Sequence, residues 1–480
     1  SSPQYNPFMI VADRTAGEED GRCYGLSFVY SGNFKGEAEK DQYGQTRVIM
    51  GLQDELFSYR LKPGEAFYGP EVILSYSGEG IGKLSRNFHK VIRHNLCRGK
   101  FKEMPRPVLV NNWEATYLDF TGEKICEIGR QAAELGIEML VLDDGWFGKR
   151  DSDSVSLGDW VVNEKKLGGP LSSIVERVNA MGLKFGLWVE PEMVSEDSDL
   201  YRAHPDWAMV IPGRRPVRSR QQLVLDFSRE EVADYIFDSL CRVLDSANVE
   251  YLKWDMNRSV IDVYSALAGC AEQGEVLYKY TLGLYRFLDR IGRRYPNILI
   301  EGCSGGGGRF DAGMLYYGPQ IWCSDNTDAI DRIRIQYGTS FGYPISAVGS
   351  HVSAVPNHQT GRSVPLKTRG AVAMAGSFGY ELDLGKLTPA EKEEVKAQVK
   401  AYKDNWKLIQ DGEYYRLSNP YEPDGLGAWE FAAEDGSEAL LTVVALNTHG
   451  NPLTSYVRLK GLRADGWYRD EAAGKMYEGR

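Results

Sequence analysis

Between residue 105 and residue 380, short apolar segments alternate with amphipathic ones, and this alternation limits the possible folds more than any other feature. The apolar segments are about six residues long, as buried strands are, and the segments between them have the apolar spacing of helices. The candidate strands are 108–112, 138–143, 183–189, 251–255, 298–302, 320–324, 344–349 and 372–379. Eight strand–helix units over about 300 residues predict an α/β fold, the (β/α)8 TIM barrel. A doubly wound parallel sheet is the alternative.

Start and stop signals support the helices between these strands. A capping-box pattern occurs at 228–231 and again at 388–391, where a proline occupies the first helical position. Thr121 is expected to open another helix, which Gly136 ends.

The two ends of the chain have the residue pattern of β-strands joined by turns. Residues 1–103 contain short alternating segments at 24–30, 46–50 and 71–76, separated by glycine-containing turns. Beyond the barrel region of 104–410, residues 411–480 predict an antiparallel β domain, with a hairpin over 427–446 and a further strand at 456–462. We therefore expect a central barrel with a β-rich unit on each side.

Composition restricts the partners and the compartment. The 480 residues carry 56 Lys and Arg against 67 Asp and Glu, a net charge of −11, which argues against nucleic acid and anionic membranes as partners. The seven cysteines are scattered and form no CxxC pair, as expected of a reduced, cytoplasmic protein without a zinc site. There is no signal-peptide pattern and no apolar run long enough to span a membrane. No cofactor or metal is expected.

The segment 253–258, Lys-Trp-Asp-Met-Asn-Arg, reads as a strand end that delivers a carboxylate. Lys253 and Asp255 are two residues apart, so their side chains share one face of a strand. A neighbouring cation favours the ionised carboxylate, which is the form that a covalent glycosidase uses as its nucleophile. A structural ion pair at a strand edge is the alternative. Asp325, at the end of another apolar strand, favours the catalytic interpretation.

Other strand ends carry further carboxylates and tryptophans, and such ends meet on one face of a barrel. They lie at 111–114, 143–146, 188–192 and 301–308. Carboxylates with indole rings suit a ligand that has many hydroxyls and one apolar side. The alternatives are a divalent metal at 143–144, a phosphate at the glycine run 305–308, and tryptophans that only fill the core. We expect the glycine run to let a ligand approach the backbone.

Several of these segments together resemble glycoside hydrolase family 36, and bacterial α-galactosidases in particular. The resemblance is carried by NNWEATY at 111–117, LDDGWF at 142–147, GLWVEPEM at 186–193, KWDMNR at 253–258, EGCSGGGGR at 301–309 and WCSDNTD at 322–328. It extends in order from about residue 20 to the end of the chain.

The resemblance implies a role for each matching residue. It implies a retaining mechanism in which Asp255 is the nucleophile and Asp325 the general acid and base. It implies a substrate-binding set of Trp113, Asp143, Asp144, Trp146, Trp188, Arg220, Lys253, Asn257, Cys303 and Gly306. Within that set, Asp143 and Asp144 would bind the 4- and 6-hydroxyls of galactose, and Cys303 and Gly306 would lie beside the 2-hydroxyl.

The expected function is that of an exo-acting α-galactosidase acting on a galactoside oligosaccharide of the melibiose or raffinose type. The alternatives are an α-N-acetylgalactosaminidase or galactosaminidase of the same fold, and a catalytically inactive sugar-binding barrel. Residues 1–103 would be the remnant of a larger N-terminal β-sandwich, so the chain is expected to be a fragment. The full-length protein would be a homo-oligomer.

Overall fold

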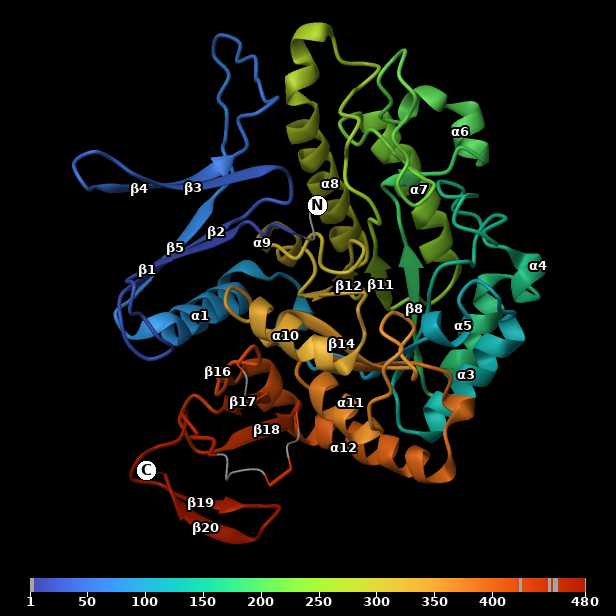
Figure 1. The fold of residues 1–480 in the computed structure, drawn as a ribbon. Coiled ribbons are helices and arrows are strands. Elements are labelled where there is room, and N and C mark those ends of the chain that lie inside the picture. Colours follow the sequence, from blue (N-terminus) through green and yellow to red (C-terminus); the bar gives the residue numbers. More distant parts are fainter. Residues whose placement is uncertain (1–3, 423–424, 448–449, 452–455, 480) are drawn as a thin grey trace.

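The computed structural model describes residues 4–422, 425–447, 450–451 and 456–479, and its centre is a closed barrel of eight parallel strands (Figure 1). The order around the barrel is β6–β7–β8–β11–β12–β13–β14–β15, and β15 pairs with β6 to close it. These strands are β6 (Leu109–Asn111), β7 (Met139–Leu142), β8 (Lys184–Val189), β11 (Tyr251–Trp254), β12 (Leu299–Gly302), β13 (Gln320–Trp322), β14 (Val348–Ser353) and β15 (Ser377–Glu381). The predicted TIM barrel is confirmed, and the doubly wound sheet is excluded.

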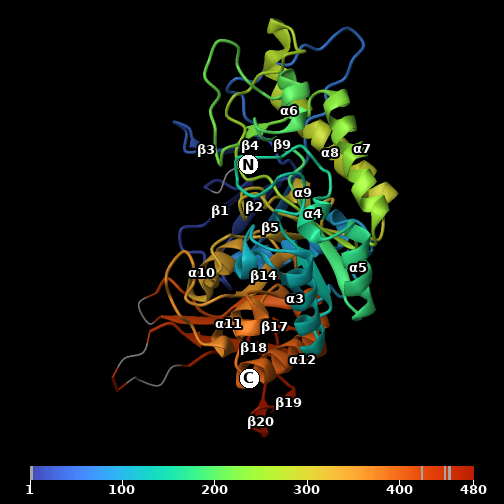
Figure 2. The ribbon, with the colours of Figure 1, turned by 90° about the vertical axis from the view of Figure 1, so that its right-hand side faces the viewer.

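Helices surround the barrel because each carries an apolar stripe that must be buried against another element. Figures 1 and 2 show them on the outside of the strands. The longer ones are α3 (Gly122–Glu134), α5 (Leu171–Ala180), α7 (Glu230–Ser246), α8 (Val276–Arg294), α10 (Ala329–Thr339), α11 (Leu366–Ala373) and α12 (Pro389–Asp411). Within the described residues, no helix is both long and apolar enough to cross a membrane.

The two ends of the barrel interior differ in chemistry. Leu109, Met139, Tyr251 and Leu299 each begin a barrel strand, and they form one buried apolar cluster with Val141. This cluster fills the amino-terminal end of the barrel. The opposite, carboxyl-terminal end carries the buried charged side chains described below, so the strand direction decides where a polar site can form.

Two of the three predicted helix starts are confirmed. Thr388 caps α12 in a complete capping box with Glu391, and the Thr121 hydroxyl accepts the backbone N–H of Lys124 at the start of α3. The capping box expected at Ser228 is wrong. Helix α7 begins at Glu230, and the Ser228 hydroxyl donates to Asp226 instead, at 2.5 Å.

The last two barrel strands lie four or five residues beyond their predicted starts. Residues Ile345–Ala347 form a short 3-10 turn before β14, and helix α11 occupies the first part of the predicted strand 372–379. The apolar residues that suggested these strands are buried in the turn and the helix instead. Strand β14 itself carries Ser350, His351 and Ser353, and these polar residues are the reason why the apolar pattern did not predict its position.

The N-terminal region forms an antiparallel sheet of β1 (Phe8–Ala12), β2 (Cys23–Phe28) and β5 (Val72–Ser77), with a separate hairpin of β3 (Phe34–Lys40) and β4 (Thr46–Leu52). Helix α1 (Gly80–Val91) packs on this sheet through Leu84 and Phe88, which are fully buried beside Cys23. Figure 1 shows these strands in blue, beside the barrel.

The C-terminal region is also antiparallel. Strands β16 (Glu413–Arg416), β17 (Leu426–Ala432) and β18 (Ala439–Ala445) form one sheet, which confirms the predicted hairpin over 427–446. The predicted strand at 456–462 is wrong. There the backbone N–H groups of Lys460 and Gly461 donate to the Glu430 carboxylate, so they do not form a strand ladder. A further hairpin, β19 (Trp467–Asp470) and β20 (Lys475–Glu478), follows.

Candidate active site

A polar cavity of about 220 Å³ opens at the carboxyl ends of the barrel strands. This is the end of the barrel at which loops and strand termini can present side chains to a ligand. The lining residues are Trp113, Glu114, Asp143, Asp144, Trp188, Arg220, Lys253, Asp255, Asn257, Trp322, Asp325, Thr327, His358, Gln359 and Glu381.

Asp255 follows strand β11 directly and is only 5% exposed. Its Oδ2 accepts the indole N–H of Trp188 at 3.1 Å and the amide N–H of Asn257 at 2.8 Å. Its Oδ1 accepts the backbone N–H of Met256 at 2.8 Å and of Gly305 at 3.3 Å. All four partners are donors, so the site holds this group as a carboxylate with a fixed orientation.

Asp325 lies beyond the end of β13, at the side of the same cavity. Its Oδ1 accepts the indole N–H of Trp322 at 3.1 Å, and its backbone carbonyl accepts the side-chain amide of Gln359 at 3.0 Å. Burial, reinforced by the negative charge of Asp255, raises the pKa of Asp325 to about 6. The two carboxyl groups are thus close enough to interact and have different environments.

The two adjacent carboxylates at the end of β7 each face a cation. Lys253 Nζ lies 2.8 Å from Asp143 Oδ2, and Arg150 forms several hydrogen bonds with Asp144, the shortest 2.8 Å. Lys253 was expected to act on Asp255 as a neighbouring cation, and the ion pair that it forms is with Asp143. Its ammonium group reaches past β8 to the end of β7, two strands away. The cations already neutralise the charge that a divalent metal would need.

Most of the predicted site residues line the cavity: Trp113, Asp143, Asp144, Trp188, Arg220, Lys253, Asp255, Asn257 and Asp325. Trp146 does not. Its side chain is fully buried, packs against Phe147 and Trp160, and donates its indole N–H to the backbone carbonyl of Trp188 at 2.9 Å. Trp146 thus lies behind the cavity wall, as a core residue that supports Trp188.

Cys303 and Gly306 also lie outside the lining. The last three glycines of the run, Gly306 to Gly308, pack against protein backbone where an approach of ligand was expected. Cys303 is 3% exposed. A Cβ atom on Gly306 would lie 2.6 Å from the backbone N of Asp325 and 2.7 Å from Cα of Ser324. Gly306 also has a φ of +81°. A glycine is therefore needed for the loop to pack directly on the backbone that carries Asp325.

Comparison with known proteins agrees with this arrangement. Residues 66–412 match the Melibiase family, residues 1–62 match the glycosyl hydrolase family 36 N-terminal domain, and residues 426–480 match the corresponding C-terminal domain. The chain belongs to glycoside hydrolase family 36. The resemblance inferred from the motifs is confirmed.

The relatives of this family 36 chain include a bifunctional α-galactosidase/sucrose kinase of Mediterraneibacter gnavus, 58% identical over 100% of this chain and 50% of the relative. The α-galactosidase AgaA of Geobacillus stearothermophilus is 54% identical over 99% of this chain and 65% of the relative. The crystal structure of AgaA superposes with a TM-score of 0.97, over 99% of this chain and 66% of that chain, and a variant of it binds raffinose. The chain thus spans about one half to two thirds of these curated relatives.

Six lining residues of the family 36 chain were absent from the predicted site: Glu114, Trp322, Thr327, His358, Gln359 and Glu381. Glu114, Trp322 and Thr327 lie inside recognised motifs, within three residues of residues that were selected. Glu381 ends strand β15, so a correct boundary for that strand would have revealed a further strand-end carboxylate. His358 and Gln359 lie in the loop between β14 and α11, which no motif covers.

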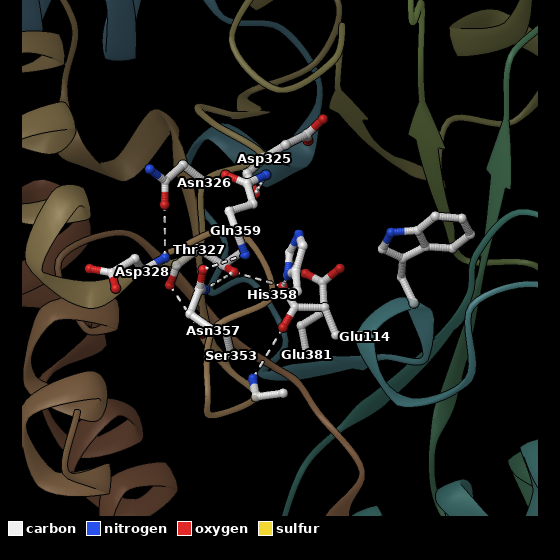
Figure 3. A network of polar contacts seen from close by, with 12 residues as sticks. Glu114, Asp325, Asn326, Thr327, Asp328, Ser353, Asn357, His358, Gln359 and Glu381 are labelled. Carbon is white, nitrogen blue, oxygen red and sulfur yellow. Dashed lines mark hydrogen bonds and ion pairs between the residues drawn. The ribbon is translucent and has the colours of Figure 1, made fainter. Parts of the chain in front are cut away.

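Glu114, Thr327 and Gln359 belong to a polar network beside Asp325, and Glu381 lies next to it (Figure 3). Glu381 accepts a hydrogen bond from, or forms an ion pair with, His351 at 3.0 Å, and the His351 ring lies 4.5 Å from that of Trp322. Glu114 accepts the hydroxyl of Thr327 at 2.7 Å. Burial, with a contribution from the charge of Glu381, raises the pKa of Glu114 to about 8.

Proposed function

We propose that this chain carries the catalytic barrel of a retaining, exo-acting α-galactosidase that removes terminal α-galactosyl residues from oligosaccharides of the melibiose and raffinose type. One observation carries the proposal. Two strand-end carboxyl groups share a small polar cavity. Their surroundings differ in the way that a nucleophile and a proton donor require. Asp255 accepts hydrogen bonds from four donors, whereas burial and Asp255 raise the pKa of Asp325 to about 6.

In the first step, Asp255 attacks the anomeric carbon and the bond to the leaving oxygen breaks, while Asp325 gives that oxygen its proton. A glycosyl–enzyme ester on Asp255 results. In the second step, Asp325 takes a proton from a water molecule, which attacks the anomeric carbon and releases Asp255. Trp188, which donates to Asp255 at 3.1 Å, orients the nucleophile.

The remaining lining groups suit the recognition of one galactose unit. Asp143 and Asp144 are held in place by Lys253 and Arg150, so their free oxygen positions can accept hydrogen bonds from sugar hydroxyls. Trp113 and Trp188 offer indole surface to the apolar face of the ring. The cavity of about 220 Å³ is small, as an enzyme that removes one terminal unit requires.

The relatives support galactose as the sugar, because those compared above are named α-galactosidases and one solved variant holds raffinose. A location in the cytoplasm and a homo-oligomeric full-length protein also remain predictions. The seven cysteines, all free in the structure, support the first of these.

The test is turnover of 4-nitrophenyl α-galactoside by the 480-residue chain, with proton NMR of the first-formed sugar. We expect α-galactose before mutarotation, because two inversions at the anomeric carbon retain its configuration. Initial release of the β-anomer would contradict the retaining mechanism. The absence of turnover, together with binding of galactose, would favour a sugar-binding barrel.

A further inference from the structure

The loop between β14 and α11, residues 354–365, reaches the active-site cavity at the side where Asp325 lies. His358 and Gln359 at its tip line the cavity, and both are exposed to solvent. Deeper in the cavity, the side chains of Asp143, Asp144 and Lys253 are only 5, 7 and 8% exposed. The cavity therefore has a closed floor and an open mouth, and the loop forms part of the mouth.

A substrate in this cavity has a defined direction. The galactose ring belongs on the closed floor, where paired carboxylates and Lys253 can bind hydroxyls out of water. The leaving group is attached through the oxygen that Asp325 protonates, so it must extend from Asp325 toward the mouth. Gln359 is hydrogen-bonded to the backbone of Asp325: its amide Nε2 donates to the Asp325 carbonyl at 3.0 Å.

The loop is held rigidly in this position. Asn357 donates to the Thr327 hydroxyl at 3.0 Å, and its own side-chain oxygen accepts the backbone N–H of Gln359 at 3.0 Å. Thr360 donates to Asp328 at 2.7 Å, and Arg362 forms an ion pair with the same carboxylate. Figure 3 shows the loop residues facing the segment that carries Asp325. A fixed loop can present binding groups at low cost in entropy.

Glu114 joins the two segments from inside the protein. Its side chain is 2% exposed, one oxygen accepts the Thr327 hydroxyl at 2.7 Å, and the other accepts the backbone N–H of Ala354 at 3.1 Å. The oxygen that binds Thr327 also lies 3.4 Å from Nδ1 of His358. Both Glu114 oxygens are thus engaged by protein groups, and the His358 ring is oriented with Nε2 directed away from Glu114.

We propose that His358 and Gln359 bind the sugar unit that follows galactose, the leaving group, through its hydroxyls, and that Glu114 is the positioning residue that holds their loop. The inference rests on the proposed function for the identity of the two sugars. Imidazole Nε2 and the Gln359 amide oxygen supply the hydrogen-bonding groups. This recognition would distinguish oligosaccharides from galactosides whose leaving group has no hydroxyls.

The test compares melibiose with 4-nitrophenyl α-galactoside. His358→Ala and Gln359→Ala should each lower the ratio of kcat/KM for melibiose to kcat/KM for the nitrophenyl substrate by about tenfold, mainly through KM. Val355→Ala, an exposed residue of the same loop outside the lining, is the control and should leave the ratio unchanged. An unchanged ratio in both loop variants, or an equal fall on both substrates, would overturn the proposal.

Glu114→Ala should lower the same ratio, whereas Glu114→Gln, which keeps an oxygen for Thr327, should restore part of it. If Glu114 had a purely structural role, its loss would lower the melting temperature and would lower kcat/KM equally for both substrates. Binding to an Asp255→Asn chain separates this inference from the proposed function. In that chain, His358→Ala should weaken the binding of melibiose about tenfold more than the binding of galactose. This comparison can be made even if the parent chain does not hydrolyse melibiose. Equal weakening of both sugars, or no binding of either, would overturn it.

Discussion

The indole N–H of Trp322 points at Oδ1 of Asp325 across 3.1 Å. Trp322 is itself held by the His351 ring at 4.5 Å and lies beneath the ammonium group of Lys253 at 5.8 Å. The orientation of the proposed acid is thus set by a strand-end residue with a packed ring. A proton-donating carboxyl group needs both this fixed orientation and a pKa close to the working pH.

The first prediction concerns pH. Burial, followed by the charge of Asp255, raises the pKa of Asp325 to about 6, and the group must be protonated to assist departure of a sugar. The kcat/KM for melibiose should therefore fall as pH rises through about 6, about tenfold per pH unit beyond it. A pH profile from 4 to 9 measures this. Asp325→Asn should lack this fall at high pH, because the titrating carboxyl group is gone. Nitrophenyl galactoside serves for that assay, because its leaving group departs without a proton.

The second prediction concerns stability. A carboxyl group whose pKa rises from 3.8 to about 6 on folding stabilises the folded state at low pH, and this contribution is lost as pH rises through about 6. At pH 8 the ionised Asp325 therefore lowers the free energy of unfolding. Asp325→Asn should raise the free energy of unfolding at pH 8 by roughly 1–3 kcal/mol, and by less at pH 5. Thermal melting at both pH values tests this, and a loss of stability at pH 8 would contradict it.

The third prediction concerns the nucleophile. Asp255→Gly should lower turnover by a factor on the order of 10³ or more, while the chain stays folded. Azide can enter the space left by the carboxylate and should convert an activated α-galactoside to β-galactosyl azide. Near-normal activity without azide would assign the role to another carboxylate, such as Asp143 or Asp144.

The fourth prediction concerns the glycine loop. Gly306→Ala places a Cβ atom 2.6 Å from the backbone N of Asp325, at a residue with a φ of +81°. The loop must move and take Asp325 with it, so we expect activity to fall by about 10²-fold. Gly182→Ala is the matched control, since its φ is +83° but its Cβ would meet nothing within 4 Å. Equal activities in the two variants would show that only backbone strain matters.

The fifth prediction concerns the 2-position of the sugar. The chain should prefer α-galactosides to α-N-acetylgalactosaminides by at least about 10²-fold in kcat/KM. The segment that carries Cys303 and Gly306 packs on the Asp325 backbone without spare volume, so it cannot retreat to admit an acetamido group. Comparison of the two nitrophenyl glycosides measures the preference. An equal or reversed preference would assign the chain to the alternative function and leave the barrel and the catalytic pair intact.

The sequence alone was sufficient to predict the barrel, because strand and helix periodicity are local properties of the chain. It also predicted that Asp255 and Asp325 would meet in one cavity, since both follow apolar strands and parallel strands must end on one face. The helix start at Thr388 was predictable for the same reason, because every group of its capping box lies within four residues.

Only the tertiary structure decided which side chains meet. Lys253 pairs with Asp143 on a strand that is distant in sequence, Gly306 packs on the backbone of Asp325, and Trp146 lies behind the cavity wall. His358 and Gln359 reach the cavity from a loop without a periodic pattern. Contacts of this kind depend on strand register and on the path of loops through space, and both are settled by packing across the whole barrel.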